Sequence, residues 1–323
     1  MEIDALLVVD KPEGITSMDV VREIKRRFRI RKAGHIGTLD PFATGVLPVV
    51  LNEGTKLVPF LEEEPKEYEA LLKLGEETTT DDMTGEIVDR KPWENIPPLH
   101  IEAALQAFVG TIQQIPPMFS AIKWNGRPLY RLARKGIEVE RKEREVRIFD
   151  LQVQAVHPPQ VLFKVSCSRG TYVRALGRDI GRRLGCGGHL TRLRRLRSGP
   201  FTIERSIPWE TLKGLSAVGD LHPWLVTLRE ALKRLPDVVG DDRLVRKVRV
   251  GQEMVVQDLF DQHLPAFGKG QWVTLSSPEE GLVAILESEI QGTDLWQMDP
   301  KIVALRPLRV FRNPNRFQRE GYA

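Results

Sequence analysis

The sequence predicts a chain of mixed helices and strands that ends in a small β-barrel. Up to about residue 235, segments with strand-like alternation are interspersed with segments of helical spacing, and we find no internal repeat. Beyond that point, Gly, Pro and Asp separate five short β-rich runs, a rhythm typical of a small barrel. These runs span residues 244–250, 253–256, 271–275, 282–287 and 302–305.

The first elements are a strand, a helix and a loop. Residues 5–9 (ALLVV) predict a short buried strand. Thr16 or Ser17 can cap a helix over 18–28, where apolar residues recur at helical spacing. Residues 33–48 are rich in Gly, Thr and Pro and therefore predict an irregular loop.

The middle of the chain alternates between strands and helices. Strands are predicted at 67–75, 145–155 and 160–167, the last two as a pair, and helices at 101–109 and 171–184. Residues 114–130 contain Pro116-Pro117 and Asn125-Gly126, which predict a loop or a hairpin.

Length and composition predict a globular protein and exclude several classes. The chain has 323 residues, 41% hydrophobic and 28% charged, so it can bury a sizeable core. Cys167 and Cys186 are too few for a disulfide framework and favour a reducing compartment. No apolar run approaches the roughly 20 residues of a membrane span, and the acidic N-terminus does not resemble a signal peptide. We therefore expect a cytoplasmic protein.

The distribution of charge is more informative than the net charge of +4. Residues 61–90 hold eleven acidic and three basic residues, whereas residues 22–32 hold seven basic residues and one acidic. Residues 166–205 hold ten Arg, no Lys and two acidic residues. Because guanidinium groups bind phosphate bidentately and stack on bases, the Arg-rich segment predicts contact with phosphate or nucleic acid. A solvated helix face is the alternative interpretation.

One loop holds the strongest candidates for catalysis. In Gly34-His35-Ile36-Gly37-Thr38-Leu39-Asp40-Pro41, the proline directs Asp40 toward an extended conformation, and the glycines permit close approach of a ligand. A carboxylate and a histidine in such a loop are typical of active sites. A structural Asp-Pro turn explains the same residues equally well.

Several other chemistries lack their motifs. The sequence contains no GxxxxGK[ST], GxGxxG, HExxH or GxSxG pattern. Cys186 and His189 supply two ligands, which do not make a zinc site, and Cys186 is better explained as a small buried residue. A reaction that uses one carboxylate, with no cofactor and no metal, remains.

An ordered set of stretches resembles the TruB family of tRNA pseudouridine synthases, which isomerise uridine 55 in the T-loop of tRNA. The stretches are LLVVDKPEGITS (6–17), AGHIGTLDPFATGVLPV (33–49), KEYEALLKLGEETTTDD (66–82), IPPMFSAIKWNGRPLYRLARKGIEV (115–139), CSRGTYVRALGRDIG (167–181) and GCGGHLTRLRRLRSG (185–199). They cover about 200 residues in the family's order, and it is the ordered set that makes the resemblance specific.

The resemblance implies a role for seven residues. Asp40 matches the catalytic aspartate, and His35 the histidine that holds the flipped-out T-loop. Tyr68 matches the tyrosine that stacks on the target uracil and is implicated in removing the C5 proton. Tyr172 matches a tyrosine near the target, and Arg174 the arginine that pairs with the aspartate. Leu193 matches an apolar pocket residue and Lys11 a lysine that supports the site. On pattern alone, most of these residues could equally be core or surface residues.

The resemblance also implies the architecture and the partner. We expect an α+β pseudouridine synthase fold over 1–235 with a mixed, largely antiparallel sheet and a mobile thumb-like insertion at about 115–145. A PUA-like RNA-binding β-barrel is expected over 236–312, and a polar tail over 313–323. The expected partner is the T-arm of tRNA, with no membrane and no required protein partner, and the expected state is a monomer.

The reaction needs neither redox chemistry nor ATP. The base must leave the stack, and the carboxylate can attack C1′ or C6, or deprotonate C2′; the sequence leaves these three open. A non-catalytic tRNA-binding or tRNA-folding protein and a guide-RNA-dependent pseudouridine synthase subunit are the alternative functions.

Overall fold

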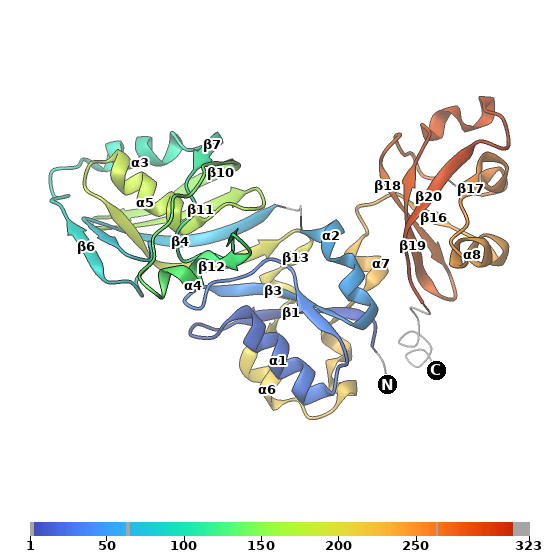
Figure 1. The fold of residues 1–323 in the computed structure, drawn as a ribbon, viewed down its shortest axis with the longest axis horizontal. Helices are drawn as coiled ribbons and strands as arrows, with labels where there is room; N and C mark the ends of the chain where they lie inside the picture. The colour runs from blue at the N-terminus through green and yellow to red at the C-terminus, as the bar shows by residue number, and fades with distance from the viewer. Residues whose placement is uncertain (1–2, 63–64, 263, 313–323) are drawn as a thin grey trace.

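The computed structural model describes residues 3–62, 65–262 and 264–312, so the tail expected at 313–323 lies outside the described residues. Its largest element is an eleven-stranded sheet (Figure 1). The main path of the sheet is, in order, β14 (Ile207–Pro208), β1 (Ala5–Lys11), β3 (Thr44–Leu51), β12 (Gly188–Ser198), β4 (Lys66–Leu74), β11 (Gln160–Cys167), β10 (Arg144–His157) and β7 (Gly110–Gln114). Three further strands pair with β12, β1 and β3: β13 (Phe201–Thr202), β15 (Leu225–Thr227) and β2 (Ala33–His35).

The sheet is mixed and largely antiparallel, as expected. Within the described part of this sheet, only the β1–β14 and β3–β12 pairs are parallel. The β3–β12 pair is also short: Thr44 faces Arg194 and Gly45 faces Arg195. We call this contact the seam, because it joins the β1–β3 half of the sheet to the β4–β12 half. Gly45 has φ +102°, and a Cβ there would lie 2.2 Å from the carbonyl oxygen of Arg195, so only glycine fits.

Three helices cover the sheet. Helix α1 (Ser17–Phe28) begins at Thr16, whose side chain accepts a hydrogen bond from the amide of Asp19 in a capping box. Its buried side chains follow helical spacing and join the main core cluster, together with residues of α5 (Val173–Arg183) and α3 (Pro98–Gln106). Fully burying each such apolar side chain contributes about 1.5–3 kcal/mol.

The insertion at 115–143 leaves the sheet between two paired strands. Strand β7 pairs antiparallel with β10, so the insertion begins and ends close together. It contains the hairpin β8 (Lys123–Trp124) and β9 (Arg127–Pro128), followed by α4 (Leu129–Ala133). Asn125 and Gly126 both have positive φ, as a two-residue hairpin turn requires, so the predicted hairpin is confirmed.

Shorter elements complete the first 235 residues. They are η1 (Asn52–Leu57), α2 (Val58–Leu61), β5 (Glu76–Thr78), β6 (Ile87–Arg90), η2 (Ile203–Arg205), α6 (Trp209–Gly214), η3 (Val218–Trp224) and α7 (Leu228–Ala231). Within the described ranges, no helix is long and apolar enough to cross a membrane.

The C-terminal part forms a second, five-stranded sheet. Its order is β16 (Asp237–Val239), β18 (Trp272–Ser277), β19 (Gly281–Ser288), β20 (Val303–Val310) and β17 (Met254–Val255), with η4 (Val256–Leu259) and η5 (Gly292–Gln297) beside it. The edge strands β16 and β17 do not pair with each other in the described part of the chain, so the sheet is a curved half-barrel (Figure 1).

One predicted strand is a helix. Residues 244–250 were predicted as β-rich, but α8 spans Asp242–Arg249. Asp241 caps it by accepting a hydrogen bond from the amide of Leu244, and Leu244, Val245 and Val248 are buried at helical spacing. The capping aspartate and this spacing outweigh the β propensity of the valines.

The two sheets share an apolar cluster. Leu282, Ile285 and Phe311 of the C-terminal part are buried together with Val8 and Val50 of the main sheet. The rings of Phe60 and Trp272 meet edge-to-face with centroids 4.9 Å apart. The half-barrel is therefore packed against the first 235 residues, in part through α7, which contacts β19.

Candidate active site

A cavity of about 470 Å³ lies where the insertion, the Gly37–Asp40 loop, β4, β12 and α5 come together. This volume falls within the range of roughly 300–1,000 Å³ that is usual for small-ligand sites. Five of the seven predicted site residues line it: Asp40, Tyr68, Tyr172, Arg174 and Leu193. Residues far apart in the sequence thus meet as the ordered motifs implied.

The catalytic candidate Asp40 stands in a tightly anchored loop. The amide of Ala43 donates to the carbonyl of Asp40 at 3.1 Å, which closes the Asp-Pro turn. Ser17 donates to the carbonyl of Leu39 and accepts from its amide, at 3.0 and 2.8 Å. The side chain of Asp40 remains 34% exposed, so its carboxylate is open to the cavity.

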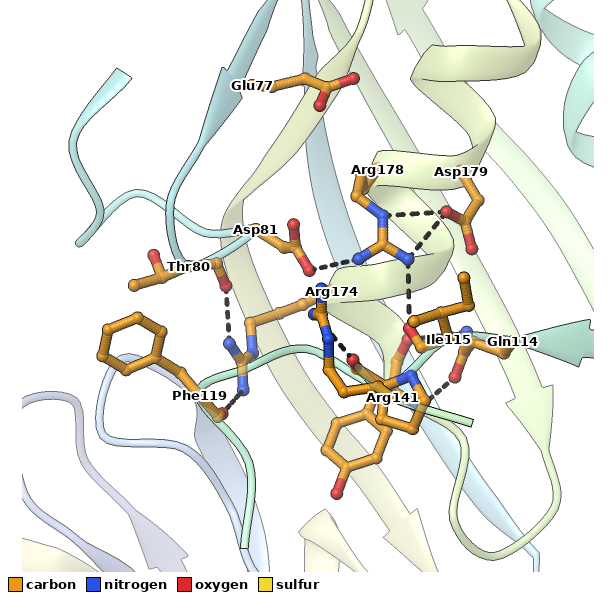
Figure 2. Close-up of polar contacts among 12 residues, drawn as sticks. Glu77, Thr80, Asp81, Gln114, Ile115, Phe119, Arg141, Arg174, Arg178 and Asp179 are labelled. Carbon is orange, nitrogen blue, oxygen red and sulfur yellow. Dashed lines mark hydrogen bonds and ion pairs between the residues drawn. The ribbon is translucent and has the colours of Figure 1, made fainter. Parts of the chain in front are cut away.

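Arg174 is buried and forms an ion pair with Asp40. Its side chain is only 3% exposed, and its Nε donates to Oδ2 of Asp40 at 2.8 Å. The same guanidinium donates to the carbonyls of Thr80 at 2.6 Å and Phe119 at 2.8 Å (Figure 2). Burial opposes the charge, but Asp40 and Asp82 outweigh it and raise the pKa of Arg174. All of its three donor nitrogens have partners, which only the planar fork of arginine provides.

Tyr68 and Leu193 come from adjacent strands. Strand β4 pairs with β12 so that Tyr68 lies opposite Arg195 and Leu193 opposite Ala70. Tyr68 is 8% exposed, and burial raises the pKa of its phenol although the nearby Arg195 opposes this. Its hydroxyl therefore keeps its proton at neutral pH.

Arg195 has a structural role that its place in the Arg-rich segment did not indicate. It is 1% exposed and donates to the carbonyls of Val46 at 2.7 Å and Gly37 at 2.9 Å. Its guanidinium thereby fixes the start of the Gly37–Asp40 loop. The spacing of arginines in the sequence cannot distinguish such a buried member from its exposed neighbours.

Tyr172 stands at the N-terminus of α5 and is fixed by Gln114. The amide of Tyr172 donates to Oε1 of Gln114 at 2.8 Å, and Nε2 of Gln114 donates to the carbonyl of Tyr172 at 3.1 Å. The ring is half-buried, and this burial raises the pKa of its phenol. Nothing in the sequence points to Gln114, since an isolated glutamine at a strand end carries no pattern.

His35 and Lys11 lie beside the cavity and do not line it. Nδ1 of His35 is buried without a hydrogen-bond partner in the described structure, and burial followed by the charge of Arg195 lowers the pKa of its imidazole. Lys11 is fully buried and donates to the carbonyls of Pro12, Ile15 and Pro41. It thus ties the end of β1 to the loop that holds Asp40.

Comparison with known proteins identifies the family. Residues 25–173 match the TruB family pseudouridylate synthase N-terminal domain, and residues 174–234 match the tRNA pseudouridylate synthase B C-terminal domain. The tRNA pseudouridine synthase B of Geobacter sulfurreducens is 46% identical over 309 residues, which cover 96% of this chain and 100% of that protein. The chain belongs to the TruB family. The protein of the same name from Syntrophus aciditrophicus is 40% identical over 96% of this chain and 99% of its own length.

Solved structures support the fold of this TruB family chain. A chain of a Cbf5-Nop10-Gar1 complex is similar with a TM-score of 0.74 and 29% identity, covering 96% of this chain and 85% of that one. A chain of an H/ACA RNP bound to a substrate RNA is similar with a TM-score of 0.73 and 28% identity, covering 96% and 86%. The pseudouridine synthase fold expected from the sequence is confirmed. Residues 235–323 lie outside both family domains.

In this TruB family chain, six arginines of the Arg-rich segment form ion pairs, several of them with carboxylates of the acidic segment. Strand β12 lies beside β4, and arginines on β12 and α5 form ion pairs with carboxylates, several of them from 61–90. The pairs are Arg174 with Asp40 and Asp82, Arg178 with Asp81 and Asp179, Arg182 with Glu77, Arg192 with Glu69, Arg194 with Asp10, and Arg197 with Glu67. From the sequence, these segments are predicted to be separate patches; they pair because β4 and β12 are neighbours in the sheet.

Exposed cations without ion pairs occur in two other segments. In the described structure, Lys25, Arg29, Arg31 and Lys32 at the end of α1, and Lys123, Arg127, Arg131, Arg134 and Lys135 on the insertion, are exposed and form no ion pair. The first segment leads to the Gly37–Asp40 loop, and the second follows Ser120, Ala121 and Ile122, which line the cavity.

The cysteines are buried, as predicted for Cys186. Burial raises the pKa of the Cys167 thiol to about 12, so it is not a nucleophile at neutral pH. Among the described residues, no group of three or more potential ligands could hold a metal ion.

Proposed function

We propose that this protein isomerises uridine 55 in the T-loop of tRNA to pseudouridine, with Asp40 as the catalytic carboxylate. The observation that carries the proposal is the pair of Asp40 and Arg174 at the wall of a cavity that also holds Tyr68, Tyr172 and Leu193. The relatives named tRNA pseudouridine synthase B, which align over nearly the whole chain, support the reaction and the substrate.

The reaction balances without a cofactor. The C1′–N1 bond breaks, the base rotates, the C1′–C5 bond forms, and the proton lost from C5 is balanced by one gained at N1. Asp40 acts as the nucleophile at C1′ or C6, or as the base at C2′. Its carboxylate is accessible from the cavity, while Arg174 fixes the carboxylate's position. Such fixed geometry is what converts a weak nucleophile or base into an effective one.

The apolar and aromatic residues receive the flipped base. Unstacking a nucleotide costs a few kcal/mol, and stacking on an aromatic ring returns roughly 1–3 kcal/mol. Tyr68 and Leu193 provide the stacking and apolar surface, and Tyr172 fixes the base from the α5 side. Because Tyr68 keeps its proton at neutral pH, removing the C5 proton requires that this phenol first be deprotonated. His35 holds the T-loop, and Lys11 supports the catalytic loop.

The RNA contacts lie on the insertion and on the C-terminal part. The insertion at 115–145 acts as a thumb, and its exposed cations meet the phosphates of the T-arm. Residues 1–235 form the catalytic domain, and residues 236–312 a PUA-like RNA-binding domain. Phe260 and Trp296 stack there with centroids 5.3 Å apart, and Trp296 is 67% exposed, which suits contact with bases or riboses.

The protein acts as a monomer in the cytoplasm and needs no guide RNA or protein partner. The similar chains in the Cbf5 complex and the H/ACA RNP are parts of larger assemblies. The relatives that match over the whole chain bear the name of a tRNA enzyme, which favours action on tRNA alone.

One assay separates the candidate functions. The purified protein is incubated with unmodified tRNA or a T-arm stem-loop, and pseudouridine is mapped by carbodiimide primer extension. We expect product at uridine 55, and none with Asp40→Asn. A non-catalytic folding protein gives no product but keeps tRNA binding in Asp40→Asn, and a guide-dependent subunit gives product only when a guide RNA is added.

A further inference from the structure

Helix α5 presents one arginine per turn to the acidic segment 77–82. Arg174, Arg178 and Arg182 are four residues apart, so their side chains lie on one face of the helix. We call these residues and their carboxylate partners the arginine ladder. Within the segment 77–82, the N···O distances of these ion pairs are 3.4 Å from Arg174 to Asp82, 2.9 Å from Arg178 to Asp81 and 2.6 Å from Arg182 to Glu77.

The middle rung of the ladder is buried. Arg178 is 7% exposed and Asp81 8%. Arg178 also contacts Asp179 at 2.9 Å and donates through Nη2 to the carbonyl of Ile115 at 3.2 Å (Figure 2). One guanidinium therefore joins helix α5, the loop after β5 and the first residues of the insertion.

Asp81 has an unfavourable backbone conformation that its hydrogen-bond partners stabilise. Its φ is +61°, in the left-handed region that a residue with a side chain seldom adopts. Its carbonyl accepts from the amide of Leu190 at 3.1 Å, and its carboxylate accepts from Arg178. A buried carboxylate without a partner is strongly unfavourable, so the loop depends on Arg178.

Both segments held by Arg178 also contact Arg174. Arg174 donates to the carbonyl of Thr80, next to Asp81, and to the carbonyl of Phe119, four residues after Ile115. We call residues 115–119 the leg of the insertion. Within it, the carbonyl of Pro116 accepts a hydrogen bond from Arg141 at 3.1 Å. Displacing either segment therefore moves a partner of the guanidinium that fixes Asp40.

We propose that Arg178 and Asp81 are positioning residues for catalysis: their ion pair fixes the 80–82 loop and the 115–119 leg, against which Arg174 holds Asp40. The proposal rests on the proposed pseudouridine synthase activity. Neither residue lines the cavity, so their effect is on the rate of the chemical step and not on RNA affinity.

The outer rung provides a matched control. Arg182 lies on the same helix face and pairs with Glu77, but its side chain is 58% exposed and it contacts neither Thr80 nor the insertion in the described structure. Glu77 itself is only 12% exposed, but the exposed guanidinium is screened by solvent, so this pair contributes less than the buried one. Arg182→Gln therefore removes the same chemical group as Arg178→Gln without disturbing the segments around Arg174.

The kinetic test uses single-turnover pseudouridine formation with a saturating excess of enzyme over a T-arm stem-loop, with RNA affinity measured separately by filter binding. We expect Arg178→Gln and Asp81→Asn each to lower the rate by about tenfold or more, as small misplacements of catalytic groups do, while affinity stays within about threefold. Asp81→Asn is chosen because asparagine tolerates positive φ. The double variant should lose no more than the worse single variant, because both act through one pair.

Hydrogen–deuterium exchange of peptides covering 115–122 gives a readout that does not depend on activity. We expect faster exchange there in Arg178→Gln and parent-like exchange in Arg182→Gln. Unchanged exchange in Arg178→Gln would overturn the proposal. Single-turnover rates of Arg178→Gln and Asp81→Asn within twofold of the parent would also overturn it. So would a loss of rate that the unfolded fraction of the variant, measured in a thermal melt, fully explains. A parent chain without activity would instead count against the proposed function, and exchange would still decide whether Arg178 holds the leg.

Discussion

Nε of Arg174 lies 2.8 Å from Oδ2 of Asp40, although 134 positions separate the two residues in the sequence. Asp40 belongs to the loop anchored on β1 and β3 through Lys11 and the turn at Pro41. Arg174 belongs to α5, which packs on β12 and β4. The ion pair thus crosses the seam of the sheet, and the proposed catalytic centre forms only when both halves are in register.

Replacing Arg174 with lysine should nearly abolish activity. Lysine keeps the positive charge but cannot donate simultaneously to Asp40, Thr80 and Phe119 in the planar arrangement that arginine provides. We expect single-turnover pseudouridine formation to fall about 100-fold, the scale on which lost positioning acts. A variant that kept more than a tenth of the parent rate would show that charge alone suffices.

Replacing Gly45 with any residue that has a side chain should destabilise the folded protein. In Gly45→Ala, the added Cβ would lie 2.2 Å from the carbonyl oxygen of Arg195, so the seam must open. Gly170→Ala is the control, because Gly170 has φ +80° with nothing within 4 Å of an added Cβ. The left-handed conformation alone costs about 1–2 kcal/mol. Urea unfolding should show a distinctly larger loss for Gly45→Ala, and equal losses would contradict the steric argument.

The buried Lys11 should make stability depend on pH in the alkaline range. Burial lowers the pKa of its ammonium from the usual 10.5 to about 8. Between about pH 8 and 10.5 the unfolded chain holds this proton and the folded chain does not, so this residue makes the free energy of unfolding rise with pH. Below about pH 8 both states are protonated, and the contribution stays constant.

Lys11→Met isolates this effect from other titrating groups. The free energy of unfolding of the parent, minus that of Lys11→Met, should be larger at pH 9.5 than at pH 7.5. Denaturant titrations at the two pH values measure it. The same difference at both values would mean that Lys11 keeps its proton in the folded protein.

The salt dependence of RNA binding should come from the insertion and not from β12. Replacing Arg131 and Lys135 with glutamine removes exposed cations that form no ion pair in the described structure. Each phosphate contact contributes roughly 0.7–0.9 to the slope of log affinity against log salt, so we expect a shallower slope. Replacing Arg192 and Arg197, which pair with Glu69 and Glu67, should leave the slope nearly unchanged. The opposite pattern would return the phosphate contacts to the Arg-rich strand.

Local patterns predicted the elements near the site well. The Thr16 cap, the helix after it and the hairpin at Asn125-Gly126 all depend on short-range chemistry that a sequence displays directly. The ordered motifs also indicated that Asp40, Tyr68 and Arg174 would meet, as they do around the cavity.

Long-range pairing could not be predicted in the same way. Several acidic residues of 66–90 face arginines of 166–205 because β4 and β12 are neighbours, and strand order is not visible in composition. The burial of Arg195 and the Arg178–Asp81 pair follow from that order. For α8, Asp241 and the spacing of Leu244 and Val248 are local signals for a helix. The valines of 244–250 favour a strand and outweighed these signals in the prediction.

The apolar cluster between the two sheets affects which RNA shapes the protein can bind. Because Ile285 and Phe311 belong to one buried apolar cluster with Val8 and Val50, we expect the half-barrel to keep its position and not to swing as a tethered module would. The distance between the cavity and the exposed Trp296 is then constant in the folded protein. An RNA that touches both points must match that span, so its overall shape is selected as well as its base.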